Sequence, residues 1–311
     1  MNLKKIILSN FILIFFLTLS SHSLENKIVL KIDQDIITSL DIENEKNYLS
    51  ALNPNLRELN NKKILEISKN SLIREKIKKV EILKNTNKAK LDNNYLEKII
   101  ETRYISLGLK TKKEFIAYLK KFDIDIGIVF KKIEIEALWN QLVFSKFSKN
   151  INIDKENLRK KIKLNNNSNK IKEFFLREIV FNIQEKSNLD KEYNLIKKSI
   201  LETGFENTAS LYSISDTAKT GGALGWVNEN SLNSKIKEAL LGLDLKQYSE
   251  PITIPGGFLI LQISEKRDIK EKIDIEVELK KIINAETNRQ LNQFSNIYFN
   301  KVKQEISINE I

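Results

Sequence analysis

The chain of 311 residues contains no cysteine and a single histidine, His22. Without cysteine there can be no disulfide framework, thiol nucleophile or thiolate metal site. Because His22 lies in a segment that we expect to be removed, the mature protein has no imidazole for Ser-His-Asp catalysis or metal ligation. An all-carboxylate site for a hard cation remains open in principle, but the sequence has no regular loop of the EF-hand type. We therefore expect neither a metal nor any other cofactor.

Proline and glycine are also scarce, with 3 prolines and 9 glycines, and most of the glycines fall between Gly221 and Gly257. Because these residues interrupt regular structure, their concentration in one region predicts that the rest of the chain is largely helical. No segment after residue 19 is a long apolar run without charges. We therefore expect the mature chain to have no stable membrane span.

The start of the chain has the pattern of a secretory signal peptide. Lys4 and Lys5 form a positive start, residues 6–19 are apolar, and Ser21-His22-Ser23 supplies small residues before a cleavage site at Leu24. The apolar run is shorter than the roughly 20 residues that a transmembrane helix needs. An uncleaved membrane anchor is the alternative interpretation. The sequence thus predicts a signal peptide over residues 1–23 and export to the periplasm.

The net charge is +11 at pH 7, and removal of Lys4 and Lys5 with the signal leaves +9. A basic surface attracts nucleic acid, anionic lipid or acidic polypeptide. Nucleic acid is the least expected of these partners outside the cytoplasm, and the lysines form no compact cluster. We interpret the charge as a diffuse compositional bias that favours solubility, and we expect no nucleic-acid partner.

Residues 24–164 predict a mostly helical domain that opens with two short strands. Ile28, Leu30 and Ile32 alternate as in a half-buried strand, and residues 36–37 are a second strand candidate. Residues 38–41 have the pattern of a capping box that begins a helix. Apolar residues then recur at helical spacing to Ile162. The Asn- and Ser-rich segment that follows predicts a linker over residues 165–170.

Residues 171–268 predict a compact α+β unit with the element order β-α-α-β-α-β-β. The expected strands are residues 172–182, 223–227, 251–254 and 258–263, and the expected helices are residues 189–203, 205–212 and 235–243. Residues 269–311 return to helical spacing from Ile275 to about Ile306 and end in a short strand candidate. The chain as a whole is thus predicted to be of the α+β class.

Residues 211–266 resemble the second half of a parvulin-type peptidyl-prolyl cis-trans isomerase domain. The resemblance lies in three segments: Leu211 to Trp226 with its paired glycines, Ser249-Glu250-Pro251-Ile252, and Pro255-Gly256-Gly257-Phe258. Gly221-Gly222 allows a turn with positive φ and a close approach to a buried strand, and Gly256-Gly257 allows a tight reversal. An ordinary α+β domain with two such turns is the alternative interpretation.

The whole chain after the signal is similar to the family of the periplasmic chaperone SurA and its relatives. Members of that family have an N-terminal helical region, one or two parvulin domains and a C-terminal helix that packs back on the N-terminal region. Residues 28–33 and 36–42 resemble the start of that family. The resemblance implies one parvulin-like domain, a mostly helical chaperone domain completed by the C-terminal helix, and unfolded or proline-containing polypeptides as partners. Outer-membrane protein precursors are the expected clients.

The resemblance also assigns candidate catalytic positions, although the histidines of the family are missing. Residues 177–180 match the strand in which parvulins carry their first histidine, so Glu178 stands in its place. Ser215 matches a family Cys or Asp before the paired glycines, and Asp216 is next to it. One interpretation makes Glu178 and Asp216 a replacement acid pair, and the other makes them surface carboxylates without a role.

The family's prolyl pocket is matched by Leu224, Leu232 and Ile236. Leu259, which follows the Gly-aromatic pair where the second histidine is expected, is a fourth candidate for this pocket. A plain hydrophobic core is the alternative interpretation, above all for Leu224. Prolyl isomerisation requires only that a twisted amide be bound more tightly than a planar one. Together with the missing histidines, the resemblance predicts a periplasmic, ATP-independent chaperone that binds unfolded exported proteins and carries a parvulin-like domain. An active isomerase for exported proteins and a non-catalytic assembly scaffold are the alternatives.

Overall fold

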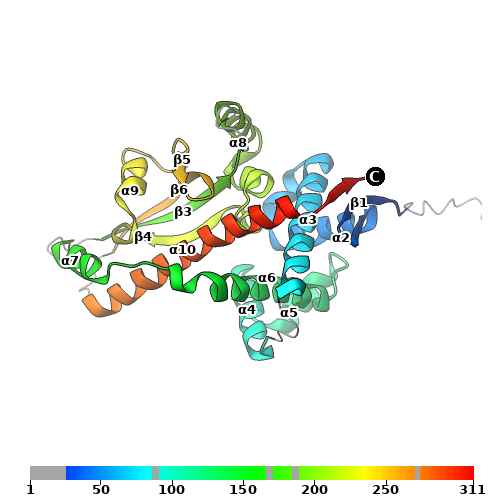
Figure 1. The fold of residues 1–311 in the computed structure, drawn as a ribbon, viewed down its shortest axis with the longest axis horizontal. Helices are drawn as coiled ribbons and strands as arrows, with labels where there is room; N and C mark the ends of the chain where they lie inside the picture. The colour runs from blue at the N-terminus through cyan, green and yellow to red at the C-terminus, as the bar shows by residue number, and fades with distance from the viewer. Residues whose placement is uncertain (1–25, 86–90, 166–170, 184–188, 270–273) are drawn as a thin grey trace, which may run out of the picture.

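The computed structural model describes residues 26–85, 91–165, 171–183, 189–269 and 274–311. The predicted signal peptide and all but the first residue of the predicted linker lie outside these ranges. None of the helices in the described ranges combines the length and the apolar character that crossing a bilayer requires. The prediction of an α+β fold is confirmed, because a mostly helical part and a separate antiparallel sheet are both present (Figure 1).

The N-terminal part begins with a strand pair and continues in helices. Its elements are β1 (Ile28–Ile32), β2 (Asp35–Thr38), α2 (Ser39–Leu52), η2 (Pro54–Glu58), α3 (Asn61–Asn85), α4 (Asn93–Ser106), α5 (Lys112–Lys120), α6 (Ile126–Phe147), η3 (Ser148–Asn150) and α7 (Lys155–Asn165). The predicted capping box is confirmed, since Thr38 and Asp41 bond reciprocally at the start of α2. Asp92 and Asp125 cap α4 and α6 more simply, because each side chain accepts one hydrogen bond from the backbone N–H two residues later.

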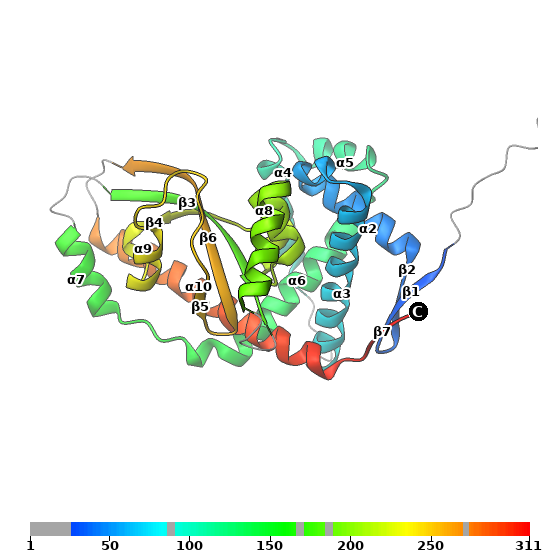
Figure 2. The same ribbon diagram turned by 90° about the horizontal axis from the view of Figure 1, so that it is seen from above.

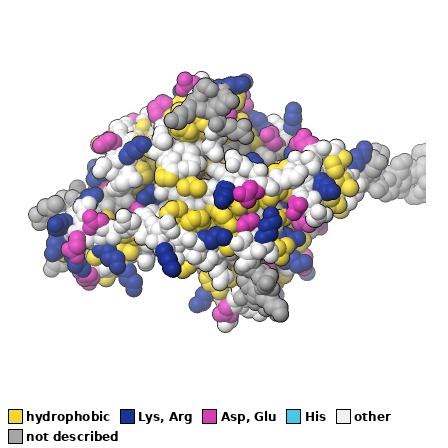
Figure 3. Space-filling view, in the orientation of Figure 1, with side chains coloured by type: hydrophobic (Ala, Val, Ile, Leu, Met, Phe, Trp, Pro, Cys, Tyr) yellow, Lys and Arg dark blue, Asp and Glu magenta, His cyan; other side chains and the backbone are white. Residues whose placement is uncertain are grey.

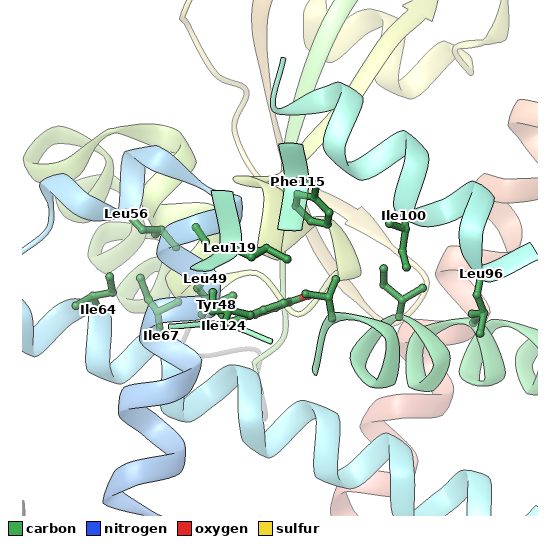
Figure 4. Close-up of a cluster of buried hydrophobic side chains, with 14 residues drawn as sticks. Tyr48, Leu49, Leu56, Ile64, Ile67, Leu96, Ile100, Phe115, Leu119 and Ile124 are labelled. Carbon is green, nitrogen blue, oxygen red and sulfur yellow. The ribbon is translucent and has the colours of Figure 1, made fainter. Parts of the chain in front are cut away.

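One hydrophobic core of this part gathers side chains from α2 to α6. Figure 4 shows how residues far apart in the sequence, such as Leu49, Ile100 and Phe115, meet in it. The helical spacing of these residues in the sequence gives each helix one apolar face, and the core forms where those faces meet.

The C-terminal helix α10 (Ile275–Glu305) runs along the molecule from α7 to the N-terminal part (Figure 2). Its last turns complete a second core, in which the rings of Trp139 and Tyr298 stack at 5.4 Å between centroids. Trp139 Nε1 also donates a hydrogen bond to Ser295 Oγ at 2.8 Å. The predicted return of the C-terminal helix to the N-terminal region is therefore confirmed.

The strand β7 (Ile308–Glu310) follows α10 and pairs antiparallel with β1, with Leu30 opposite Glu310. The resulting three-stranded sheet has the order β2-β1-β7. The predicted strand after the helix is thus present, two residues later than expected, and it joins the two ends of the described chain.

The second unit is built on a four-stranded sheet of order β4-β3-β6-β5, in which all neighbours are antiparallel. Its elements are β3 (Ile171–Phe181), α8 (Leu189–Tyr212), η5 (Asp216–Thr220), β4 (Ala223–Asn228), η6 (Glu229–Ser231), α9 (Ser234–Leu240), β5 (Ile252–Ile254) and β6 (Gly257–Ile269). The helix α8 contains both predicted helices, divided at Gly204 by a non-helical φ of 83°. The expected last strand is longer than predicted because β6 pairs with β3 along its whole length.

Candidate functional site

A cavity of about 670 Å³ lies between the face of the four-stranded sheet that carries α9 and residues 278–296 of α10. Its sheet side is apolar, with Leu176, Val180 and Leu261 from the two central strands and Ile252 from β5. In the space-filling view, hydrophobic side chains gather near the centre of the face shown, beside charged ones (Figure 3). A concave apolar surface with a few polar groups is the usual form of a small binding site.

All but one of the predicted site residues line this cavity. Leu232, Ile236 and Leu259 contribute to the apolar surface, and Leu224 lies at its edge with 38% of its surface exposed. The interpretation of Leu224 as plain core is therefore wrong. Glu178 and Ser215 also line the cavity, whereas Asp216 does not. The predicted acid pair of Glu178 and Asp216 thus does not meet in the cavity.

Glu178 is the polar centre of this site. Its Oε1 accepts hydrogen bonds from Ser215 Oγ at 2.6 Å and Thr217 Oγ1 at 2.9 Å. Burial raises the pKa of the Glu178 carboxyl, and the nearby charge of Asp216 adds to this rise against the opposing effect of the two hydroxyls. Glu178 is therefore a partly buried, hydrogen-bonded carboxyl and not a free surface carboxylate.

The paired glycines bring this polar centre together. Gly222 has a φ of +75°, and a Cβ at this position would lie 2.2 Å from the Glu178 carbonyl oxygen. The close approach allows the Glu178 N–H to donate to the Gly222 carbonyl oxygen at 2.8 Å. The loop that carries Ser215 and Thr217 is thereby fixed beside Glu178, as the sequence had led us to expect of the glycines.

Residues 179–265 match the family model described as "Rotamase: PPIC-type PPIASE domain". These residues form a parvulin-type domain.

Two curated relatives match over short segments. The periplasmic chaperone PpiD of Haemophilus influenzae is 39% identical over 51 residues, which are 16% of this chain and 8% of PpiD. The chaperone SurA of Chromobacterium violaceum is 34% identical over 64 residues, which are 21% of this chain and 15% of SurA. The matched part of the chain therefore covers less than two thirds of the length of either relative.

Two solved structures are similar over different extents. A SurA-like chaperone of Campylobacter jejuni is 17% identical with a TM-score of 0.35, and the match covers 92% of this chain and 99% of that one. The parvulin domain of PpiD from E. coli is 22% identical with a TM-score of 0.27, and the match covers 32% of this chain and 91% of that one.

The loop that follows Ser215 in the parvulin-type domain is attached to the N-terminal part. Asp216 accepts a hydrogen bond from Lys78 of α3, whose side chain is only 2% exposed. Lys78 also donates to Glu136 of α6 at 2.7 Å, and Glu136 is bonded to Lys219 as well. Although burial acts to raise it, Lys219 and Lys78 hold the pKa of Glu136 well below its usual value. Charges from both parts of the chain therefore meet in one cluster.

Arg74 of α3 extends this attachment to the backbone. Its guanidinium donates to the carbonyl oxygens of Ser213 at 2.8 Å and of Ser215 at 3.0 Å. Both ends of the short segment before Asp216 are thus held by the N-terminal part. This contact could not be predicted, because Lys78, Glu136 and Arg74 have the spacing of ordinary solvent-facing residues.

The wall of the cavity opposite the sheet was not predicted from the sequence either. It is formed by α10, whose lining residues are Glu278, Lys281, Ile282, Ala285, Glu286, Asn288, Arg289, Asn292, Gln293 and Asn296. Their recurrence at three- and four-residue steps was the available signal, since it places them on one helix face. Within the described ranges no group of three or more acidic or histidine side chains could hold a metal ion.

Proposed function

We propose that this chain is an exported, ATP-independent chaperone of the SurA type that binds unfolded polypeptides. The cavity of the parvulin-type domain is, in this proposal, a binding site for proline-containing segments. The observation that carries the proposal is the apolar surface of that cavity, to which Leu232, Ile236 and Leu259 contribute. A proline ring that packs on such a surface is removed from water, and this burial of apolar area stabilises the complex.

Three further observations support the chaperone part of the proposal. The curated relatives are named chaperones, and PpiD is named periplasmic. The pattern of a cleavable signal over residues 1–23 agrees with export. Large apolar side chains are also exposed outside the cavity, among them Tyr95, Ile105 and Phe144 on α4 and α6. Exposed apolar surface of this kind binds unfolded segments, and outer-membrane protein precursors are the proposed clients.

The test compares holding of an unfolded client with binding of a short peptide. Light scattering after dilution of a urea-unfolded porin should be suppressed by the mature chain without ATP. Fluorescence anisotropy should detect binding of a labelled Leu-Pro peptide, and Leu232→Asn should weaken it about tenfold because the substitution removes apolar contact worth about 1.5 kcal/mol. Leu241→Asn is the matched control, because Leu241 is 72% exposed and lies outside the cavity.

The two readouts separate the alternatives. A chain that neither suppresses scattering nor binds the peptide is not a chaperone, and the scaffold interpretation then takes its place. Equal peptide affinity of the Leu232→Asn and Leu241→Asn variants would move the binding site away from the cavity.

An active prolyl isomerase is the second candidate, favoured by the position of Glu178 at the cavity. The barrier of roughly 18–20 kcal/mol arises because amide resonance is lost when the bond twists. In the twisted state the prolyl nitrogen gains a free electron pair, and a protonated carboxyl, the form that burial favours at Glu178, can donate a hydrogen bond to it. Ser215 and Thr217 orient that carboxyl through its other oxygen.

The isomerase candidate is tested by exchange NMR on a prolyl peptide. Catalysed exchange that is lost in Glu178→Gln and reduced in Ser215→Ala would support it. Exchange at the uncatalysed rate, together with normal peptide binding, would leave binding as the only function of the cavity.

A further inference from the structure

The helix α10 is attached to the rim of the cavity at two distant points. Asn228 Nδ2 at the end of β4 donates a hydrogen bond to Glu278 Oε1 at 2.8 Å. At the other end, Gly256 in the turn between β5 and β6 lies so close to α10 that a Cβ there would be 2.7 Å from Ile297. Residues 278 and 297 are about 28 Å apart along the helix, given its rise of about 1.5 Å per residue. The helix therefore spans the cavity and is held at both sides of it.

Between these attachments, α10 presents a row of amide side chains to the cavity. Asn288, Asn292 and Asn296 follow one another at intervals of four residues, and Gln293 lies beside them. Among the residues that the structure describes, no hydrogen bond joins any of these four side chains to another group. Asn296 nevertheless has only 8% of its surface exposed. A buried amide normally has a partner, so Asn296 is an unused donor and acceptor, whereas the exposed Asn288 and Asn292 can bond to water or to a ligand.

The charged residues of the same wall are already engaged with one another. Arg289 bonds Glu286 at 2.5 Å, and Lys281 lies 3.8 Å from Glu278. The wall therefore offers paired charges and free amides. A ligand that matches it is uncharged and carries its own amide groups.

The spacing of the row fits an extended polypeptide. Four residues of an α-helix rise about 6.0 Å, while two residues of an extended chain advance about 6.6 Å. An extended chain presents an N–H and a C=O to the same edge at every second residue. Each amide side chain can donate to one of these groups and accept from the other.

We propose that Asn288, Asn292, Gln293 and Asn296 bind the main chain of an extended, unfolded polypeptide, so that α10 is the second wall of the peptide site. The apolar sheet surface takes one side chain, such as proline, and the amide row holds the flanking main chain whatever its sequence. This inference rests on the proposed peptide-binding function and adds to it the side chains that bind the main chain of the peptide. Such a site can bind many different clients, because only one apolar side chain of each client has to fit the sheet surface.

The test measures peptide affinity of the full mature chain by fluorescence anisotropy. The probe is a fluorescein-labelled peptide with a central Leu-Pro flanked by alanines. Asn292→Ala and Asn296→Ala should each weaken binding about fivefold, which corresponds to a net loss of about 1 kcal/mol for one hydrogen bond. Asn284→Ala is the matched control, because Asn284 is an exposed asparagine of α10 that does not line the cavity. Since Asn292 is exposed, its substitution keeps the test valid even where Asn296→Ala impairs folding.

A second probe identifies what the amides bind. It replaces one peptide bond beside the proline by an ester, which removes a main-chain N–H. The ester should bind the unaltered chain several-fold more weakly than the amide, and this difference should shrink in Asn292→Ala.

The outcomes are separable. The proposed role of the amide row would be overturned if three variants, Asn292→Ala, Asn296→Ala and Asn284→Ala, bind the peptide with equal affinity. If Leu232→Asn still binds it weakly, the proposed function stays intact. Absence of any peptide binding by the unaltered chain would overturn the proposed peptide site in the cavity, and with it the inference that rests on that site. If the unaltered chain self-associates in sedimentation experiments and the Asn292→Ala variant does not, a second copy of the chain occupies the row. That result would also overturn this inference.

Discussion

Asp216 of the parvulin-type domain and Lys78 of helix α3 are joined by a hydrogen bond across the boundary between the two parts of the chain. Lys78 is buried and donates at the same time to Glu136, which is bonded to Lys219 of the parvulin-type domain. The loop that positions Ser215 and Thr217 beside Glu178 is thus fixed from outside its own domain. The geometry of the cavity therefore depends on helices that do not line it.

Lys78→Met should loosen this loop. The substitution removes the donor to Asp216 but leaves Glu136 paired with Lys219, so we expect a loss of about 2 kcal/mol in the free energy of unfolding. Hydrogen exchange should become faster for the amides of residues 216–220. Lys79→Met is the matched control, because Lys79 is 44% exposed and its contact with Asp35 is a surface ion pair. Unchanged exchange in Lys78→Met would show that the cluster does not hold the loop.

Glu178 should make stability fall as pH rises. Because its folded-state pKa lies above the ordinary value of 4.5, the folded chain binds more protons than the unfolded chain in the interval between the two values. The stabilisation is fully present below the ordinary value and is lost as pH rises through the folded-state pKa. Urea unfolding between pH 4 and pH 8 should therefore show a steeper decline for the unaltered chain than for Glu178→Gln. Parallel curves for the two proteins would contradict this assignment.

Gly222→Ala should destabilise the parvulin-type domain by about 3 kcal/mol or more. The added methyl group would meet the Glu178 carbonyl oxygen, and positive φ is unfavourable for alanine as well. Gly242→Ala separates the two effects, since Gly242 has a φ of +83° but nothing within 4 Å of an added Cβ. That control should cost only about 1–2 kcal/mol. Thermal melting of both variants measures the loss of stability. Equal losses of stability in the two variants would rule out the close approach of Gly222 to Glu178 as the cause.

Phe299→Ala should destabilise the N-terminal part, although Phe299 lies near the end of α10. Its ring is 7% exposed and meets Trp139 edge to face at 6.3 Å between centroids. Truncation of such a buried ring typically costs about 3–5 kcal/mol. Val277→Ala on the exposed face of the same helix should change the free energy of unfolding by less than about 0.5 kcal/mol. Chemical denaturation of both variants tests the shared core, and similar midpoints would argue against it.

Much of the fold could be predicted because its signals are local. Caps at Thr38, Asp92 and Asp125 fix helix starts within three residues, and the paired glycines mark the turns of the parvulin-type domain. The apolar side of the cavity could be predicted as well, since Leu232 and Ile236 follow from the resemblance.

The remaining parts of the site depend on contacts between distant segments. Asp216 and Lys78 are 138 residues apart, and nothing near either residue in the sequence indicates the other. The amides of α10 have the composition of a solvent-facing helix surface, because polar residues on a helix usually face water. Only the path of α10 across the sheet makes Asn292 and Asn296 part of a cavity.

The pairing of β7 with β1 has a consequence for how this chain reaches its native state. Residues 28–32 are made long before their partner at residues 308–310. Contacts between such distant segments require closure of a very long loop and slow folding accordingly. The N-terminal helices therefore keep one sheet edge and part of their core uncovered until residues 308–310 have been synthesised.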